Sequence, residues 1–390
     1  MVLSKGIIKP SSSTPPHLQN LNLSFIDQTA PPSYFRLIFF YESSHDHLLS
    51  RRPELSTKLK HSLSDVLTQF HPLAGRIIIE NSCVDCNDAG VEYIETQVHT
   101  SISQVIENPN NAEDMGNYAP MDTVGWSSTK GLVPLAIQVN FFDCGGIAIG
   151  VSISHKIADA ESLVSFMTAW AAKCRGEAEI IPRSCFDLTS RFPPVDLSLF
   201  ASKAQAPPET TKKIVTKRFV FDHEKIKALK EQADSQIKNP SKVESVVGFI
   251  WRSSMATLQN YETDKNKLYI ALQAVNLRKR ASPPLPEGYF GNAIGQAMVI
   301  LSDEKQEEDE KGYPLLIAKM RKAVREVDSD YVKNMENGEE YLKQSSQLED
   351  LWLNERNSLD VCMFSSWCRF PVYEVDYGWG KPLWVYDLIS

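Results

Sequence analysis

The sequence predicts an α/β fold of two lobes of similar size, each a mixed sheet with helices. The length is the first reason, because 390 residues exceed one ordinary core and suggest about two domains. The composition is the second, because 42% hydrophobic and 23% charged residues are typical of a globular chain. The third is that strand-like and helix-like patterns alternate on both sides of one proline-rich stretch.

That proline-rich stretch divides the chain. From Phe192 to Lys213 the sequence is rich in Pro, Ser, Ala, Lys and Thr, and it offers little that a core would bury. We therefore expect an N-terminal lobe over residues 1–190, a crossover linker over 191–216 and a C-terminal lobe over 217–390.

The first clear element of the N-terminal lobe is a helix after Pro53, where five large apolar residues recur at helical spacing. Strands are expected over residues 91–95 and 135–140. The segment Asp143-Cys-Gly-Gly146 is typical of a hairpin turn leading into another strand. The apolar residues of the helix are Leu55, Leu59, Leu63, Leu67 and Phe70.

The strand after this turn, Ile147–Ser154, alternates large aliphatic residues with small ones. Its small-residue face permits close approach by a helix, another sheet or a ligand. Leu163, Phe166 and Trp170 then recur at helical spacing, which predicts a helix packed on the same sheet.

The C-terminal lobe is expected to begin with a strand over Lys217–Phe221. A helix follows for which Asp222 is the N-cap. Ser241-x-x-Glu244 is a capping-box pattern that opens another helix. The acidic run over residues 303–311 predicts a solvated loop.

Charge and hydropathy exclude several classes of protein. With 41 Lys and Arg against 49 Asp and Glu, the net charge is −8, which argues against general binding to nucleic acid or anionic membranes. The most apolar region, Leu135 to Ile153, is interrupted by polar residues and is a poor membrane span. Seven cysteines, an odd number, favour a reducing compartment. We expect a cytoplasmic protein.

Motifs for bound metals and nucleotides are missing from the sequence. There is no Gly-x-Gly-x-x-Gly, no phosphate-binding P-loop and no His-Glu-x-x-His. Cys83 and Cys86 have the spacing of a zinc-ligand pair, but no second pair or His-x-x-x-His completes a four-ligand site. We expect two thiols at a strand end and no metal.

His155 is the residue most suited to acid–base chemistry. It ends the small-faced strand and lies four residues before Asp159. An imidazole in that place is a candidate general base, although a lone histidine at a strand end is more often a structural residue.

A second segment makes the catalytic interpretation specific. His155-x-x-x-Asp159 together with Asp376-Tyr-Gly-Trp-Gly380 resembles the two signature motifs of the BAHD acyltransferases, plant enzymes that use acyl-CoA. The segment after the strand is most similar to the alkaloid-acetylating branch. Further matches occur in family order over nearly the whole chain: Leu23-Ser-Phe-Ile-Asp-Gln28, His71-Pro-Leu-Ala-Gly-Arg76, Asp143-Cys-Gly-Gly146, Asn276-Leu-Arg278 and Tyr289-Phe-Gly-Asn292.

The sequence also departs from the family pattern. Ala160 stands where glycine is usual, Tyr377 replaces a phenylalanine, and Ala293 stands where cysteine is common. Family members usually continue through further strands after the second motif, whereas this sequence reaches Ser390 ten residues later. Missing strands would leave a sheet edge unpaired or the acceptor pocket open.

The resemblance implies a two-lobed fold like that of chloramphenicol acetyltransferase, with His155 as the general base and no metal. Asp159 has two interpretations: it orients the histidine as in a triad, or, as the resemblance implies, it pairs with Arg278 of the second lobe in a structural role. Trp367 matches a tryptophan whose indole N–H can donate to the tetrahedral oxygen, and a packed core tryptophan is the alternative.

The resemblance and the local sequence together suggest where the substrates bind. The loop of Asp376, Gly378, Trp379 and Gly380 is expected to hold the lobes together and to shape the CoA side. Phosphates of CoA need cations or a helix N-terminus, and the candidates are Ser241, Lys242 and Lys381. Residues expected at the alcohol are Phe40, Tyr41, Asn292 and Phe364.

The sequence therefore predicts an acyl-CoA-dependent O-acyltransferase, with acetyl transfer to an alkaloid-type alcohol. Because Gly-x-Ser-x-Gly is absent, direct attack in a ternary complex is favoured over a covalent acyl-enzyme. We expect a monomer with no bound cofactor and with a tunnel between its lobes that brings both substrates to His155. The alternatives are a malonyl- or aromatic acyl-CoA transferase, an enzyme acting on an amine, and a catalytically weakened homologue that only binds ligand.

Overall fold

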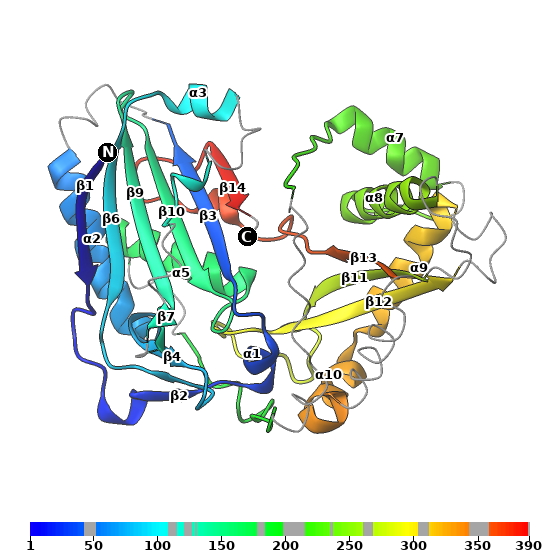
Figure 1. The fold of residues 1–390 in the computed structure, drawn as a ribbon, viewed down its shortest axis with the longest axis horizontal. Coiled ribbons are helices and arrows are strands. Elements are labelled where there is room, and N and C mark those ends of the chain that lie inside the picture. Colours follow the sequence, from blue (N-terminus) through cyan, green and yellow to red (C-terminus); the bar gives the residue numbers. More distant parts are fainter. Residues whose placement is uncertain are drawn as a thin grey trace.

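The computed structural model forms two lobes that lie side by side (Figure 1). It describes residues 1–42, 52–107, 115–120, 127–128, 131–177, 184–197, 215–234, 237–259, 268–302, 312–342 and 359–388. Within these ranges no helix is long and apolar enough to cross a lipid bilayer.

A six-stranded sheet forms the centre of the first lobe. In spatial order its strands are β1 (Val2–Ile8), β6 (Val91–Val98), β9 (Leu135–Phe142), β10 (Ile147–Ser154), β3 (Tyr34–Tyr41) and β14 (Trp384–Leu388). Helices α2 (Arg52–Gln69) and α5 (Ala160–Arg175) pack on one face, and α3 (Ile102–Glu107) contributes to the smaller cluster on the other face.

The predicted elements of this lobe are confirmed. Both expected strands occur as β6 and β9, which pair in parallel, and the expected turn joins β9 to β10 as an antiparallel hairpin. All eight residues of β10 are buried. Its aliphatic face joins the main core together with α2 and α5.

The small-residue face of β10 is covered by a loop. A Cβ atom added at Gly150 would lie 2.2 Å from the carbonyl oxygen of Tyr118 and 2.7 Å from Cα of Ala119. The residue after next, Ser152, donates a hydrogen bond to the carbonyl of Pro120 at 3.2 Å. The close approach predicted from the sequence is therefore made by the segment 118–120.

A small five-stranded sheet completes the first lobe. Its order is β2 (Asn20–Asn22), β5 (Cys83–Asp85), β4 (Arg76–Ile78), β8 (Gly131–Leu132) and β7 (Ser127–Ser128). Further short helices among the described residues are α1 (Phe25–Thr29), η1 (Pro16–Leu18), η2 (His71–Ala74) and η5 (Val372–Glu374).

The second lobe contains a three-stranded sheet in the order β12 (Ile294–Ser302), β11 (Leu268–Asn276) and β13 (Leu359–Phe364). Its helices are α7 (His223–Asp234), α8 (Lys242–Gln259), α9 (Tyr313–Glu326) and α10 (Ser329–Met335). Both predicted helix starts are confirmed. Asp222 accepts from the backbone N–H of Lys225 at 2.8 Å, and Ser241 and Glu244 form the reciprocal bonds of a capping box.

The strand predicted over Lys217–Phe221 is wrong. These residues have no regular structure and are exposed or half-buried, with 73% of Phe219 accessible to solvent. No strand of the second-lobe sheet pairs with them, and a strand needs a partner for its backbone groups. The acidic run over 303–311 and most of the predicted linker, residues 198–214, lie outside the described residues.

The predicted boundary of the C-terminal lobe also needs correction. Instead of staying in the second lobe, the chain returns to the first one, where β14 pairs with β3 and its Trp384 lies opposite Phe40. Figure 1 shows this red strand at the edge of the first sheet. Val375 and Tyr377 are buried in the first-lobe core. The second signature motif therefore belongs to the first lobe, because its apolar side chains are buried there.

We expect Gly150→Ala to destabilise the protein, because the new methyl group would overlap the backbone of Tyr118 and Ala119. Overpacking of this kind costs about 1–3 kcal/mol, measurable by chemical unfolding. Gly6→Ala is the matched control in the same sheet, since nothing lies within 4 Å of its added Cβ. Equal stability of the two variants would contradict the close packing described for this face.

Candidate active site

His155 follows the last residue of β10 and is held at both its backbone and its ring. Its backbone N–H donates to the carbonyl of Ser33 at 2.8 Å. The ring nitrogen Nδ1 lies 3.0 Å from Oδ1 of Asn292, and the ring centroid lies 4.2 Å from that of Phe35. The imidazole is therefore oriented by contacts from both lobes.

Burial lowers the pKa of His155 below its ordinary value, while the nearby Asp159 carboxylate and the hydrogen bond to Asn292 act in the opposite direction. A lowered pKa keeps the ring neutral at physiological pH. A neutral imidazole with one engaged nitrogen has the other free to accept a proton. This arrangement is chemically suited to general-base catalysis.

Asn292 lies against the histidine. Its side chain is 1% exposed, and its Nδ2 donates to the carbonyl oxygen of His155 at 2.7 Å. Asn292 was predicted at the alcohol, whereas its side-chain oxygen and nitrogen both contact His155. The structure thus brings these two predicted site residues together across a sequence separation of 137 residues.

The predicted contact between Asp159 and Arg278 is present. Arg278 Nη1 and Nη2 donate to the two carboxylate oxygens at 2.7 and 3.0 Å. Asp159 is also the N-cap of α5, because its carboxylate accepts from the backbone N–H of Ser162. The same carboxylate accepts from the backbone N–H of Ala293. Within the part of the chain that the structure describes, Asp159 makes no hydrogen bond to the His155 ring, which disfavours the triad interpretation.

Charge complementarity keeps this buried carboxylate ionised. Burial would raise the pKa of Asp159, but the Arg278 guanidinium and the hydrogen bonds hold it below the ordinary value. Arg278 is 8% exposed and also donates to the carbonyl of Gly291 at 3.0 Å. The ion pair therefore joins the start of α5 to the segment that carries Asn292.

Trp367 lies one aromatic ring away from the histidine. Its ring packs edge-on against Phe35 at 6.0 Å between centroids, and Phe35 in turn contacts His155. The side chain is half-buried at the border of the first-lobe core. This position fits both interpretations of Trp367 offered by the sequence.

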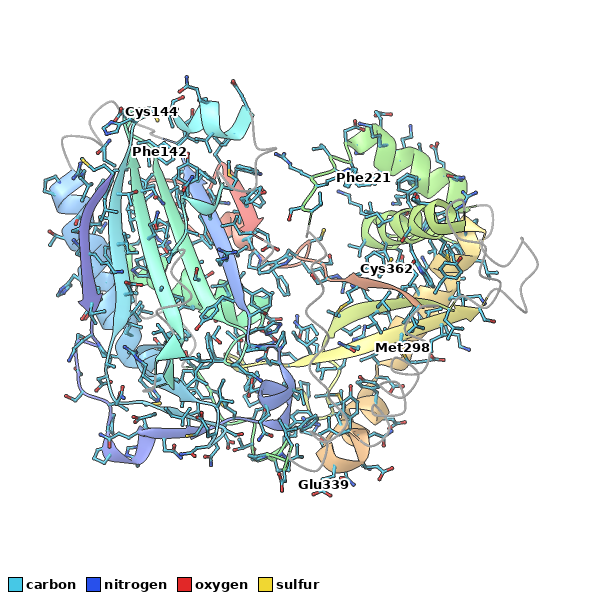
Figure 2. All side chains as sticks on the ribbon, viewed as in Figure 1. Phe142, Cys144, Phe221, Met298, Glu339 and Cys362 are labelled. Carbon is cyan, nitrogen blue, oxygen red and sulfur yellow. The ribbon has the colours of Figure 1, made fainter. Side chains whose placement is uncertain are left out.

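Phe40 and Tyr41, which the sequence also predicted at the acceptor, do not lie at the histidine. Phe40 and Tyr41 are 0% and 1% exposed, and Tyr41 pairs with Ile147 at the other end of β10, about 25 Å along the strand from His155. Figure 2 labels Phe142 and Cys144 at this hairpin end of the sheet. Phe364 packs against the second-lobe cluster around α8 and α9.

Phe35 is a site residue that the sequence analysis missed. It lies on the same strand as Phe40, and only the antiparallel register, in which Phe35 faces Ile153, brings it next to His155. No local pattern indicates that register, since a shift of one or more residues would leave the strand equally apolar.

The second signature motif forms a tight loop on the first lobe. Asp376 Oδ1 accepts from the backbone N–H groups of Gly378 and Gly380 at 2.7 and 2.9 Å, and both glycines have positive φ. Tyr377 is buried and stacks with Trp379. These contacts are consistent with a structural loop.

The three predicted CoA-binding residues differ in their surroundings. Ser241 and Lys242 are exposed at the N-terminus of α8. Lys381 instead pairs with Glu374 at 2.5 Å, so its charge is already partly neutralised within the loop. Ser241 and Lys242 therefore remain better suited than Lys381 to bind a phosphate.

Cys83 and Cys86 are free and buried. Burial raises the pKa of both thiols, that of Cys86 to about 12, which disfavours the thiolate form that binds metal. Within the described ranges no group of three or more His, Cys, Asp and Glu side chains is arranged to hold a metal ion.

The chain is similar to known proteins over its whole length. The Transferase family profile matches residues 1–390. Stemmadenine O-acetyltransferase of Catharanthus roseus is 40% identical over 389 residues, covering 98% of this chain and 86% of that protein. Vinorine synthase of Rauvolfia serpentina is 42% identical over 386 residues, with the same coverage of each chain.

Solved structures support the same fold. The crystal structure of vinorine synthase matches with a TM-score of 0.80 at 38% identity, covering 99% of this chain and 88% of that one. The structure of F. graminearum TRI101 complexed with coenzyme A and deoxynivalenol matches with a TM-score of 0.62 at 15% identity, covering 95% and 89%. The two-lobed α/β fold predicted from the sequence is confirmed.

We expect Arg278→Ala to lower the free energy of unfolding by about 3–5 kcal/mol, because it leaves the Asp159 carboxylate buried without its cation. Asp159→Asn should be destabilising as well, since it removes the buried charge with which Arg278 pairs at 2.7 Å. Lys322→Ala, which breaks an exposed pair with Glu326, is the control and should leave the melting temperature nearly unchanged. A melting temperature of Arg278→Ala close to that of the control would contradict the role of the ion pair.

Proposed function

From the premise that this chain belongs to the Transferase family of BAHD acyltransferases, we propose that it transfers an acetyl group from acetyl-CoA to a hydroxyl group of a plant specialised metabolite. The observation that carries the proposal is His155, with Nδ1 bonded to Asn292 and a pKa lowered by burial. Stemmadenine O-acetyltransferase, at 40% identity, supports the choice of acetyl group and of an alkaloid-type alcohol.

The proposed reaction is a direct transfer within a ternary complex. Nε2 of His155 takes the hydroxyl proton as the alcohol oxygen forms a bond to the thioester carbonyl carbon. The resulting tetrahedral oxyanion collapses and the carbon–sulfur bond breaks. The departing CoA thiolate then takes the proton from the imidazolium, which restores the neutral histidine.

Two neighbouring aromatic residues support this assignment. Trp367 is our candidate donor to the oxyanion, because its indole N–H is of the type that stabilises developing negative charge and its ring lies one side chain from His155. Phe35 supplies an apolar surface beside the base. We propose Phe35 and Trp367, in place of Phe40 and Tyr41, as the acceptor-side aromatics.

For acyl-CoA we propose a site at the start of α8. Ser241 and Lys242 combine a helix N-terminus with an exposed cation, which suits phosphate groups. A carboxylate is also present, since Glu244 caps the same turn, but Arg321 pairs with it at 2.7 Å. This local neutralisation leaves the positive charge of Lys242 available.

The cellular setting is part of the proposal. Seven free cysteines support a cytoplasmic location, because thiols stay reduced there. One chain supplies every residue assigned above to the base, the oxyanion and CoA, which supports a monomeric enzyme.

The substrate class is tested with acetyl-, malonyl- and coumaroyl-CoA against a panel of alkaloid and terpenoid alcohols. We expect acetyl-CoA to be consumed fastest. His155→Ala should lower kcat by about 10²–10⁴ with little change in melting temperature. Near-native turnover of His155→Ala would refute the base, and turnover with malonyl- or coumaroyl-CoA alone would refute the acetyl assignment.

We expect Lys242→Glu to raise the KM for acyl-CoA and to leave the KM for the alcohol nearly unchanged, because phosphate contacts are charge-assisted. Steady-state kinetics with each substrate varied in turn would measure this. Lys322→Glu, at another exposed position of the second lobe, controls for the change of net charge. Equal effects on both substrates would remove Lys242 from the CoA site.

A further inference from the structure

The buried carboxylate of Asp27 is hydrogen-bonded to Asn292, the residue that contacts His155. Asp27 is on α1, its side chain is 6% exposed, and its two oxygens accept four hydrogen bonds. Oδ2 accepts from the backbone N–H and hydroxyl of Ser24 at 3.2 and 2.6 Å. Oδ1 accepts from the backbone N–H and the side-chain Nδ2 of Asn292 at 3.0 and 2.8 Å.

These bonds fix which way the Asn292 amide points. Burial raises the pKa of Asp27, while the hydrogen bonds from Ser24 and Asn292 act in the opposite direction. Oδ1 of Asp27 accepts from the backbone N–H of Asn292, so the amide atom that faces the same oxygen must be the nitrogen. The second hydrogen of that nitrogen goes to the carbonyl of His155. Oδ1 of Asn292 is therefore the atom that faces Nδ1 of His155.

The donor and acceptor directions of these hydrogen bonds continue into the imidazole ring. An amide oxygen can only accept, so Nδ1 of His155 must carry a hydrogen. In the neutral ring the lone pair is then on Nε2. The hydrogen-bond directions run without interruption from Asp27 to the nitrogen that would receive the substrate proton.

We propose that Asp27 is a positioning residue that acts through Asn292 to hold His155 as the Nδ1–H tautomer, with Nε2 as the base. This inference rests on the proposed function. During the reaction Nε2 gains the alcohol proton and passes it to the CoA thiolate, while the other ring hydrogen stays on Nδ1, donated to Oδ1 of Asn292. Asp27 gains and loses no proton.

The carbonyl of His155 accepts one hydrogen bond from the Asn292 side chain, and Asp27 constrains Asn292 further. It holds both the backbone and the side-chain nitrogen of Asn292, which fixes the residue as a unit. Among the described residues, the titratable groups near these hydrogen bonds include Lys156 and Tyr289, both of which Asp27 influences electrostatically. The ion pair of Asp159 and Arg278, with Glu161 beside it, also lies near.

Asp27→Asn is the informative variant because it keeps the shape of the side chain. Its NH₂ group must face either Ser24 or Asn292, and both present backbone donors to that position. One backbone donor is then left without an acceptor, and whenever the NH₂ group faces Asn292 the orientation of the Asn292 amide is no longer enforced. Glu95→Gln is the matched control, since Glu95 is also 6% exposed and accepts from Ser4, Ser56 and Lys60 on the same lobe.

The first test is the tautomer itself, read from long-range ¹H–¹⁵N correlation spectra of the ligand-free protein, with His155→Ala identifying the signal. We expect a protonated Nδ1 and an unprotonated Nε2 in the wild type and in Glu95→Gln. Asp27→Asn should give a mixture of tautomers. An Nε2–H ring in the wild type, or an unchanged ring in Asp27→Asn, would overturn the proposal. This readout needs no activity, so its failure is distinct from a failure of the proposed function.

The second test is kinetic. We expect Asp27→Asn to lower kcat about ten- to hundredfold, as misplaced catalytic groups do, to leave the KM for acetyl-CoA unchanged and to shift the pH–rate profile. Because Asp27 acts through Asn292, adding Asp27→Asn to Asn292→Ala should change kcat less than twofold further. Additive losses, or an equal loss of kcat in Glu95→Gln, would show that Asp27 is only structural.

Discussion

The structure depends on one buried ion pair, Asp159 with Arg278, which joins the start of a first-lobe helix to a loop of the second lobe. A buried charge is tolerated only when a partner and hydrogen bonds replace water. Here the backbone N–H groups of Ser162 and Ala293 complete the shell around the carboxylate. Because Ala293 follows Asn292, the contact that holds the lobes together also sets the place of the histidine's partner.

The candidate site is assembled from short segments that are far apart in the sequence. A strand end supplies His155, a loop after the second-lobe strand β11 supplies Asn292, and the first helix supplies Asp27. Phe35 and Trp367 add an aromatic rim. Each segment is held by its own hydrogen bonds or packing, so the reacting group does not depend on a single flexible loop.

The C-terminal segment strengthens the same assembly from the other side. After leaving the second lobe at β13, the chain places Val375 and Tyr377 in the first-lobe core and ends as an added strand on β3. Tyr41 of that strand donates to the carbonyl of Val375 at 2.9 Å. The signature loop is therefore part of the packing of the lobe that carries the histidine.

The sequence by itself determined the local features of this protein: the apolar stripe of the helix after Pro53, the alternation around Gly150, the cap at Ser241, and the motif histidine with its Asp159. These depend on residues a few positions apart, where propensity and periodicity act. Only the tertiary structure decided that Phe35, and not Phe40 or Tyr41, lies at the histidine, and that Asn292 faces it. Strand register and contacts between lobes are set by packing over long sequence separations, which no local pattern contains.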